Sequence, residues 1–193
     1  MFNIIFRLLM KVIGITGTLG AGKGTIVDYL VKNKGYVHYS VRAFLSEEII
    51  KRNMMVNRDS MVMVANDLRA KHSPSYIIEQ LYEKAISLGK DCIIESIRTP
   101  GEIIALKEKG DFYLFAVNAK PEIRYQRIKL RNSETDHIDF KTFLSNEQRE
   151  MTSNDATKQN LVKCIEMADF VFYNNTTIET LQQEVEKVLT KLK

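Results

Sequence analysis

Tryptophan is missing from the 193 residues of this chain, which also hold only two cysteines, three prolines and three histidines. Cys92 and Cys164 each lie in an apolar stretch, without a second cysteine or a histidine at the spacing of metal ligands. We therefore expect both cysteines to be packing residues in a reducing compartment. The scattered histidines likewise give no support for zinc chemistry.

Long apolar runs are also absent. No uninterrupted stretch reaches the roughly 20 residues that a bilayer-spanning helix needs. Residues 1–9 are apolar, but they lack a small-residue cleavage site and continue directly into a strand, so a secretory signal is not expected. We predict an extension over 1–9, ahead of an alternative start at Met10, and a cytoplasmic protein without a membrane partner.

Neither sign of charge is in large excess. The 28 Lys and Arg against 24 Asp and Glu give a net charge of +4, which suits an anionic ligand. This charge is too small to predict nucleic-acid binding, and no base-stacking aromatic motif accompanies it. With 45% hydrophobic residues the chain can bury one core, so we expect a single domain over 10–193. The sequence leaves a monomer and a small homo-oligomer equally open.

Strand-like and helix-like segments alternate along the chain. Strands are predicted at 11–16, 36–40, 91–95, 112–117 and 169–173. Helices are predicted at 25–33, 44–52, 59–72, 73–88, 99–110, 121–131, 140–151, 161–167 and 177–192. The alternation is typical of an α/β three-layer sandwich, a parallel sheet covered by helices on both faces. The connections after the second and fourth strands are longer than a crossover needs, which makes them candidate moving parts.

A glycine-rich segment joins the first strand to the first helix. It reads Gly17-Thr18-Leu19-Gly20-Ala21-Gly22-Lys23-Gly24-Thr25. Such a backbone can turn several N–H groups toward one anion, and the helix dipole adds positive potential there. Lys23 would supply a point charge for the β and γ phosphates. We therefore predict that these nine residues bind a nucleoside triphosphate, with ATP as the expected cofactor.

The loop departs from the usual Walker pattern at one position. That pattern places Ser or Thr directly after the lysine, whereas here Gly24 precedes Thr25. The string G-x-x-G-x-G-K-G-T resembles the loop of adenylate kinase and the wider nucleoside monophosphate kinases. The resemblance runs from Lys11 to about Leu181 and extends to dephospho-CoA kinases and to relatives fused to deoxycytidylate deaminase. It implies a P-loop fold with sheet order 2-3-1-4-5, an acceptor-binding insertion at about 41–89 and a lid at about 131–150.

An acid and an arginine come after the third predicted strand. Phosphoryl transfer needs Mg²⁺ near the phosphates and cations that neutralise their oxygens. Glu95 ends a strand expected beside the first, where a Walker-B-like acid would hold Mg²⁺ together with Thr25, directly or through water. Nucleoside monophosphate kinases carry Asp-Gly-Phe-Pro-Arg at the equivalent place. By that resemblance Arg98 would bind the phosphate of the acceptor and act in catalysis.

Three arginines share one face of the helix at 121–131. Arg124, Arg127 and Arg131 are spaced three and four residues apart, and a merely solvated basic face is one interpretation. In the kinases that the chain resembles, this helix leads into a lid whose arginines close over the transferred group. The resemblance therefore implies catalytic roles for Arg127 and Arg131, and for Arg149 on the returning arm.

A second resemblance concerns the end of the last strand. The stretch Ala168-Asp169-Phe170-Val171-Phe172-Tyr173-Asn174-Asn175 is similar to the Ala-Asp-x-x-x-x-Asn segment of dephospho-CoA kinases. In those kinases the loop packs on the adenine of ATP. This implies an adenine contact for Asn174 and Asn175, although Asn-Asn is also an ordinary strand-to-helix turn.

The identity of the acceptor depends on the residues after the second strand. Dephospho-CoA kinases place an Asp there as a base for a hydroxyl, whereas residues 38–44 contain no acid. A phosphate acceptor needs cations instead, which Arg42 and Arg98 would supply. Arg69 is a further candidate for the acceptor, with a surface arginine as the alternative. These residues favour a nucleoside or deoxynucleoside monophosphate. AMP itself is not implied, because the acceptor arginine of adenylate kinases aligns with Ser46.

The sequence supports three hypotheses. The leading one is an ATP- and Mg²⁺-dependent kinase that phosphorylates a nucleotide. The second is phosphorylation of the 3'-hydroxyl of dephospho-CoA. The third is a nucleotide-sensing P-loop switch or ATPase without an acceptor, against which the lid arginines argue.

Overall fold

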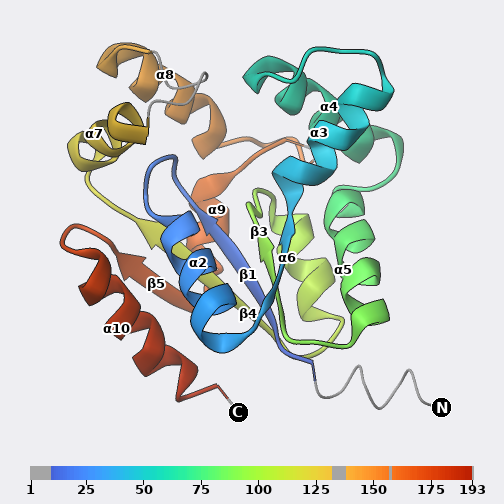
Figure 1. Cartoon of the computed structure of the whole chain (residues 1–193). Coiled ribbons are helices and arrows are strands. Elements are labelled where there is room, and N and C mark those ends of the chain that lie inside the picture. The colour runs from blue at the N-terminus through green and yellow to red at the C-terminus, as the bar shows by residue number, and fades with distance from the viewer. Residues whose placement is uncertain (1–9, 132–137, 157, 193) are drawn as a thin grey trace.

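A computed structural model describes residues 10–131, 138–156 and 158–192. The predicted extension at 1–9 and residues 132–137 of the predicted lid lie outside this range. Five parallel strands form one sheet in the order β2-β3-β1-β4-β5, which confirms the predicted fold and strand order (Figure 1). The strands are β1 (Val12–Gly17), β2 (Val37–Ser40), β3 (Cys92–Glu95), β4 (Phe112–Asn118) and β5 (Phe170–Tyr173).

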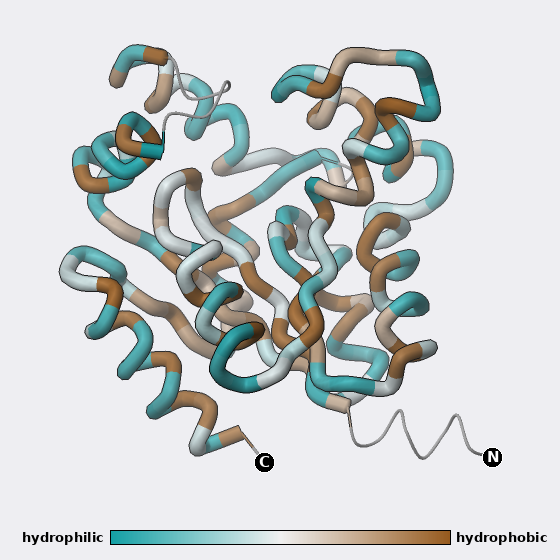
Figure 2. Tube along the Cα trace, viewed as in Figure 1, coloured by the Kyte–Doolittle hydropathy of each residue, from teal (hydrophilic) through white to brown (hydrophobic). Residues whose placement is uncertain are grey.

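Helices cover both faces of this sheet. They are α2 (Lys23–Lys34), α3 (Val41–Lys51), α4 (Arg58–Lys71), α5 (Tyr76–Leu88), α6 (Pro100–Lys107), α7 (Pro121–Arg131), α8 (Phe140–Met151), α9 (Leu161–Glu166) and α10 (Ile178–Leu189). One face packs against α2 and α10, and the other against α5, α6 and α9. Along α10 hydrophobic and hydrophilic residues alternate, as a helix with one buried side requires (Figure 2).

The central strand β1 is buried along its whole length. It pairs with β3 on one side and β4 on the other, with Val12 opposite both Cys92 and Phe112. A Cβ added at Gly14 would lie 2.5 Å from Ile97 Cδ1, so the absence of a side chain lets the segment after β3 approach β1 closely. The end of β3 is thereby held next to the loop that comes after β1.

Most helix starts agree with the sequence predictions, but α3 begins at Val41, three residues before the predicted Phe44, and the start of α5 also differs. At α6, Thr99 and Glu102 form the predicted capping box. At α5, the prediction that Ser73 caps a helix beginning at Pro74 is wrong, because α5 begins at Tyr76. The carbonyl of Ser73 instead accepts a hydrogen bond from the Tyr76 N–H, at 3.1 Å. Ser73 and Pro74 belong instead to the turn between α4 and α5.

The two long connections form two helical pairs above the carboxyl ends of the strands (Figure 1). One pair is α3 with α4, and the other is α7 with α8. Tyr125 of α7 lies 5.1 Å from the ring of Phe140 and 5.7 Å from that of Phe143, which packs α7 on α8. Across the described ranges, no helix combines the length and the apolar character that crossing a membrane demands.

Candidate active site

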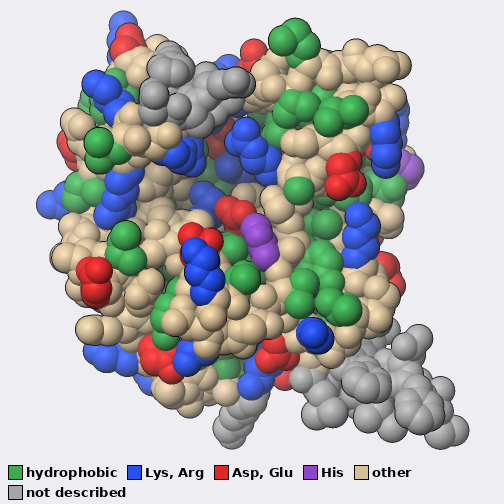
Figure 3. Space-filling view, in the orientation of Figure 1, with side chains coloured by type: hydrophobic (Ala, Val, Ile, Leu, Met, Phe, Trp, Pro, Cys, Tyr) green, Lys and Arg blue, Asp and Glu red, His purple; other side chains and the backbone are tan. Residues whose placement is uncertain are grey.

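A cavity of about 580 Å³ opens at the carboxyl ends of β1, β2 and β3, between the two helical pairs. In parallel α/β sheets this edge is where ligands bind. The space-filling view shows Lys and Arg side chains gathered in this hollow (Figure 3). The cavity is therefore suited to an anionic ligand.

The phosphate loop forms one wall of the cavity. Six of its nine predicted residues line the space, namely Leu19, Gly20, Gly22, Lys23, Gly24 and Thr25. Gly22 has φ 110 at the start of α2, and a Cβ there would lie 2.2 Å from Asn174 Nδ2. Asn174 Nδ2 also donates to the carbonyl of Ala21 at 2.8 Å, so the loop after β5 fixes the loop after β1.

The other three predicted loop residues support this wall from behind. Gly17, Thr18 and Ala21 do not line the cavity, and Thr18 and Ala21 are buried. The hydroxyl of Thr18 lies 3.2 Å from Asn118 Oδ1 at the end of β4. The carbonyls of Gly17 and Thr18 accept hydrogen bonds from Lys23 Nζ, at 2.9 and 3.0 Å. Lys23 thus connects the end of the phosphate loop to its beginning through hydrogen bonds.

Burial lowers the pKa of Lys23 to about 8, and the neighbouring charge of Arg98 contributes to this lowering. Glu95 and Glu150 act in the opposite direction. The ammonium group is therefore less stable here than in water, and the charge of a triphosphate would restore its stability. Binding of ATP is expected to favour the protonated lysine.

This pKa predicts that ATP binding depends on pH. Because phosphate prefers the protonated form of Lys23, the affinity should fall as the pH rises through about 8, approaching a tenfold loss per pH unit. Calorimetric titration of ATP between pH 7.5 and 9.5, where the charge of ATP itself is constant, measures the effect. An affinity that stays constant up to pH 9.5 would contradict the assignment of Lys23 to the phosphates.

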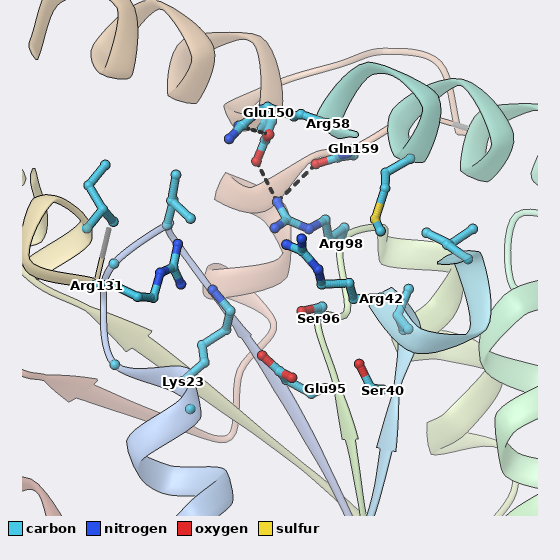
Figure 4. A pocket seen from close by; sticks show the side chains of 18 of the residues that line it. Lys23, Ser40, Arg42, Arg58, Glu95, Ser96, Arg98, Arg131, Glu150 and Gln159 are labelled. Atoms are coloured by element: carbon cyan, nitrogen blue, oxygen red, sulfur yellow. Dashed lines mark hydrogen bonds and ion pairs between the residues drawn. The ribbon is translucent and has the colours of Figure 1, made fainter. Parts of the chain in front are cut away.

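Glu95 lies beside Lys23 of the loop, at the end of β3 (Figure 4). His38 Nε2 lies 3.3 Å from Glu95 Oε2. Although burial opposes ionisation, the contact with His38 and the charge of Lys23 hold the pKa of Glu95 below its usual range. Glu95 is consequently an anion at neutral pH, and with the Thr25 hydroxyl it offers the oxygen ligands that Mg²⁺ prefers.

The opposite side of the cavity holds a cluster of arginines around one acid, shown with its labels in Figure 4. Arg98 Nη1 lies 2.5 Å from Glu150 Oε2 and 3.0 Å from Gln159 Oε1. Arg58 Nη2 bonds the other oxygen of Glu150. Burial opposes the charge of Glu150, but Arg98 and Arg58 lower the pKa of this acid. Arg42 lines the same space from the start of α3.

The predicted arginines of α7 divide between two environments. Arg127 and Arg131 line the cavity, and their catalytic roles stay a prediction. Arg127 donates two hydrogen bonds to Asn174, one to its backbone carbonyl at 2.9 Å and one to its Oδ1 atom at 3.3 Å. These bonds connect α7 to the loop after β5. Arg124 is only 3% exposed and lies outside the cavity, where it donates to the carbonyls of Ala119 and Leu19 and pairs with Glu147.

Two other predicted residues lie outside the cavity. Arg149, expected to cover the transferred group, is exposed and donates to Asn146 on the surface of α8. Its helical position turns it outward, and its neighbour Glu150 faces the cavity instead. Asn175 Oδ1 accepts from the Lys120 N–H at 2.8 Å and does not line the cavity, whereas Asn174 does. The structure therefore does not place Arg149 or Asn175 at the site.

Several cavity residues were not predicted from the sequence, among them Arg58, Ser96, Glu150 and Gln159. Ser96 has φ 72, an uncommon conformation for a residue with a side chain, at the turn that leads from Glu95 to Arg98. The other three come from separate segments and meet only in the fold. No local motif marks any of them.

Comparison with known proteins shows a family and a fold for this chain. A model of the AAA domain family matches residues 13–154. A UPF0200 protein of Pyrobaculum aerophilum is 29% identical over 187 residues, which cover 96% of this chain and 100% of that protein. The matched relative is thus similar over its full length.

Two solved structures share the fold at low sequence identity. TT1252 from Thermus thermophilus is 22% identical with a TM-score of 0.58, and the match covers 95% of this chain and 98% of that one. Shikimate kinase from Bacteroides thetaiotaomicron is 12% identical with a TM-score of 0.60, covering 94% and 99%. These likenesses confirm a P-loop kinase-like fold, while narrower membership of the nucleoside monophosphate kinases stays a prediction. Because the family match covers more than half of the chain, this protein belongs to the AAA domain family.

Proposed function

We propose that this protein is an ATP- and Mg²⁺-dependent kinase that transfers the γ-phosphoryl group to a nucleotide, a nucleoside or deoxynucleoside monophosphate. One observation carries the proposal. A single cavity holds Lys23 of the phosphate loop on one side and the side chains of Arg42, Arg58 and Arg98 on the other. Two anionic groups can therefore bind in one space with cations between and around them.

The residues present fit a magnesium ion. Thr25 and Glu95 line the cavity and would hold the ion together with phosphate oxygens. Within the described residues no group of three or more His, Cys, Asp and Glu could bind a metal alone, which agrees with an ion held mainly by the substrate. When bound, magnesium neutralises charge on the phosphates.

The charged residues of the cavity have distinct roles in this proposal. Lys23 binds the β and γ phosphates, and Arg98 and Arg42 bind the phosphate of the acceptor. Arg131 approaches the transferred group from the end of α7, while Arg127 and Asn174 lie where the adenine of ATP would pack. Together these residues bring donor and acceptor oxygens into line without covalent chemistry from the protein.

The two carboxylates that line the cavity favour a phosphate acceptor over a hydroxyl. A general base works best when its pKa lies near the operating pH. The pKa values of Glu95 and Glu150 are both lowered, the first by His38 and Lys23 and the second by Arg98 and Arg58, against the effect of burial. Neither acid is poised to take a proton, whereas a phosphate acceptor needs none removed.

A panel assay tests the function directly. ATP and GTP are each incubated with Mg²⁺ and with nucleoside monophosphates, deoxynucleoside monophosphates, dephospho-CoA and shikimate, and the products are identified by mass. We expect a diphosphate product from at least one monophosphate. Phosphorylation of dephospho-CoA or shikimate alone would replace this proposal with a hydroxyl acceptor, and slow hydrolysis without any phosphorylated product would indicate a switch.

A further inference from the structure

One face of α4 lines the acceptor side of the cavity from the first turn to the last. Its lining residues have the three- and four-residue spacing of a single helical face: Arg58, Met61, Val62, Ala65 and Arg69. An arginine stands at each end and apolar side chains stand between them. From position 58 to 69 the helix rises about 16 Å, so the acceptor side is longer than one phosphate group.

Arg69 is the buried end of this face. Its side chain is only 2% exposed, and its Nε and Nη2 atoms donate to Glu102 Oε1 at 3.2 and 2.8 Å. Its third nitrogen, Nη1, is buried and has no hydrogen-bond partner among the described residues. Buried donors in folded proteins are nearly always paired, so an unpaired guanidinium nitrogen at a cavity wall indicates a missing partner.

Glu102 is fully engaged by the protein itself. Its Oε1 atom receives both bonds from Arg69, and its Oε2 atom accepts from the backbone N–H groups of Arg98 and Thr99 at 2.7 and 3.0 Å. A ligand that enters this end of the cavity therefore finds the acid already saturated. The group left without a hydrogen-bond partner is a donor, the Nη1 group of Arg69 with its two N–H bonds, and a ligand reaches it only after a small local shift because the atom is buried.

We propose that Arg69 Nη1 recognises a carbonyl oxygen on the base of the acceptor nucleotide. This inference rests on the proposed function and narrows it to bases that carry a carbonyl: cytosine, uracil, thymine and guanine. The apolar face between Arg58 and Arg69 would pack on the flat base, with its phosphate directed toward Arg98. Adenine carries no carbonyl oxygen, and its N1 and N7 atoms each lie beside the amino group, which would set a donor against the Nη1 donor.

Binding measurements on the unaltered protein test the inference. CMP, UMP, dTMP, GMP and AMP are titrated calorimetrically, together with 2-aminopurine riboside monophosphate, a purine without the carbonyl. At least one carbonyl-bearing nucleotide should bind about tenfold or more tightly than AMP, the effect of one charge-assisted hydrogen bond. If GMP is that nucleotide, the 2-aminopurine analogue should bind no more tightly than AMP, because it lacks the carbonyl. Equal or tighter binding of AMP would overturn the inference.

The substitution Arg69→Lys tests the residue. Lysine can keep a charge beside Glu102 but lacks the second arm, so the preference for carbonyl bases should fall to about threefold or less, with ATP affinity unchanged. Arg124→Lys is the matched control, because Arg124 is equally buried and acid-paired but lies outside the cavity. It should keep the base preference. If Arg69→Lys keeps the preference for carbonyl bases, the inference is wrong, and the missing partner of Nη1 is a structural water instead of the base.

The two levels of proposal fail in different ways. If no nucleotide in the panel is phosphorylated, the proposed function is wrong. If nucleotides are phosphorylated but AMP is preferred, or all bases serve equally, only the role of Arg69 is wrong. Should Arg69→Lys fail to fold, as its thermal transition would show, the comparison of bases on the unaltered protein still decides.

Discussion

Replacing Lys23 with alanine is expected to lower the rate of phosphoryl transfer at saturating ATP by about 10²–10³-fold. The ammonium group lies at the phosphate loop and faces the same cavity as Glu95 and Arg98 (Figure 4). Charge that develops between donor and acceptor would lose one of its fixed cations. A coupled assay of nucleoside diphosphate formation measures the loss, and transfer at an undiminished rate would contradict the proposed function.

The same substitution should leave the fold intact. Burial lowers the pKa of Lys23 to about 8, below its ordinary value of 10.5, so the protonated lysine opposes folding at neutral pH. Removing the group relieves that cost, and the thermal midpoint should stay the same or rise. Lys32→Ala is the matched control, because Lys32 lies on the same helix with its side chain 73% exposed. It should change neither rate nor stability.

Most of the fold could be predicted from local patterns. Each strand is short, most are apolar, and each helix begins within three residues of its predicted start, with the largest differences at α3 and α5. The strand order came from the resemblance to known P-loop kinases, because no spacing rule orders five parallel strands. The error at Ser73 arose because a Ser-Pro pair serves a turn as well as a helix start.

The site was predictable only where its residues are close in sequence. The phosphate loop is nine consecutive residues, and Glu95 and Arg98 lie together at the end of one strand, so motifs reveal both. Glu150 meets Arg58 across 92 positions and Arg98 across 52. Such contacts depend on where the end of α8 lies relative to α4 across the cavity, which the sequence of either helix does not encode alone.

Helical spacing also could not predict which arginines of α7 reach the cavity. Arg124, Arg127 and Arg131 share that spacing, but Arg124 is drawn into the protein by the carbonyls of Ala119 and Leu19 and by Glu147. Backbone acceptors are invisible in a sequence pattern. The spacing therefore predicted a shared face, while the partners on that face decide which arginine reaches the cavity.

Replacing Arg98 with alanine is the second change with a large expected effect. The guanidinium is 21% exposed and bonded to Glu150 and Gln159, and it would bind the phosphate of the acceptor. Loss of a partly buried, hydrogen-bonded charge costs about 2–5 kcal/mol, so kcat/KM for the acceptor should fall by about 30- to 5,000-fold. The KM for ATP should change little, because Lys23 and the phosphate loop are untouched.

Arg149→Ala is the control for Arg98→Ala, since Arg149 precedes Glu150 directly but is exposed on the outer side of α8. We expect less than a twofold change in kcat/KM. An equal loss in both variants would mean that Arg149 moves over the phosphates during the reaction, in the catalytic role that the sequence resemblance implies. A loss confined to Arg98→Ala would instead mean that the acceptor phosphate binds Arg98 and Arg58, the two cations that pair with Glu150 in this structure. Binding of the acceptor would then require its phosphate to take the place of that carboxylate between Arg58 and Arg98.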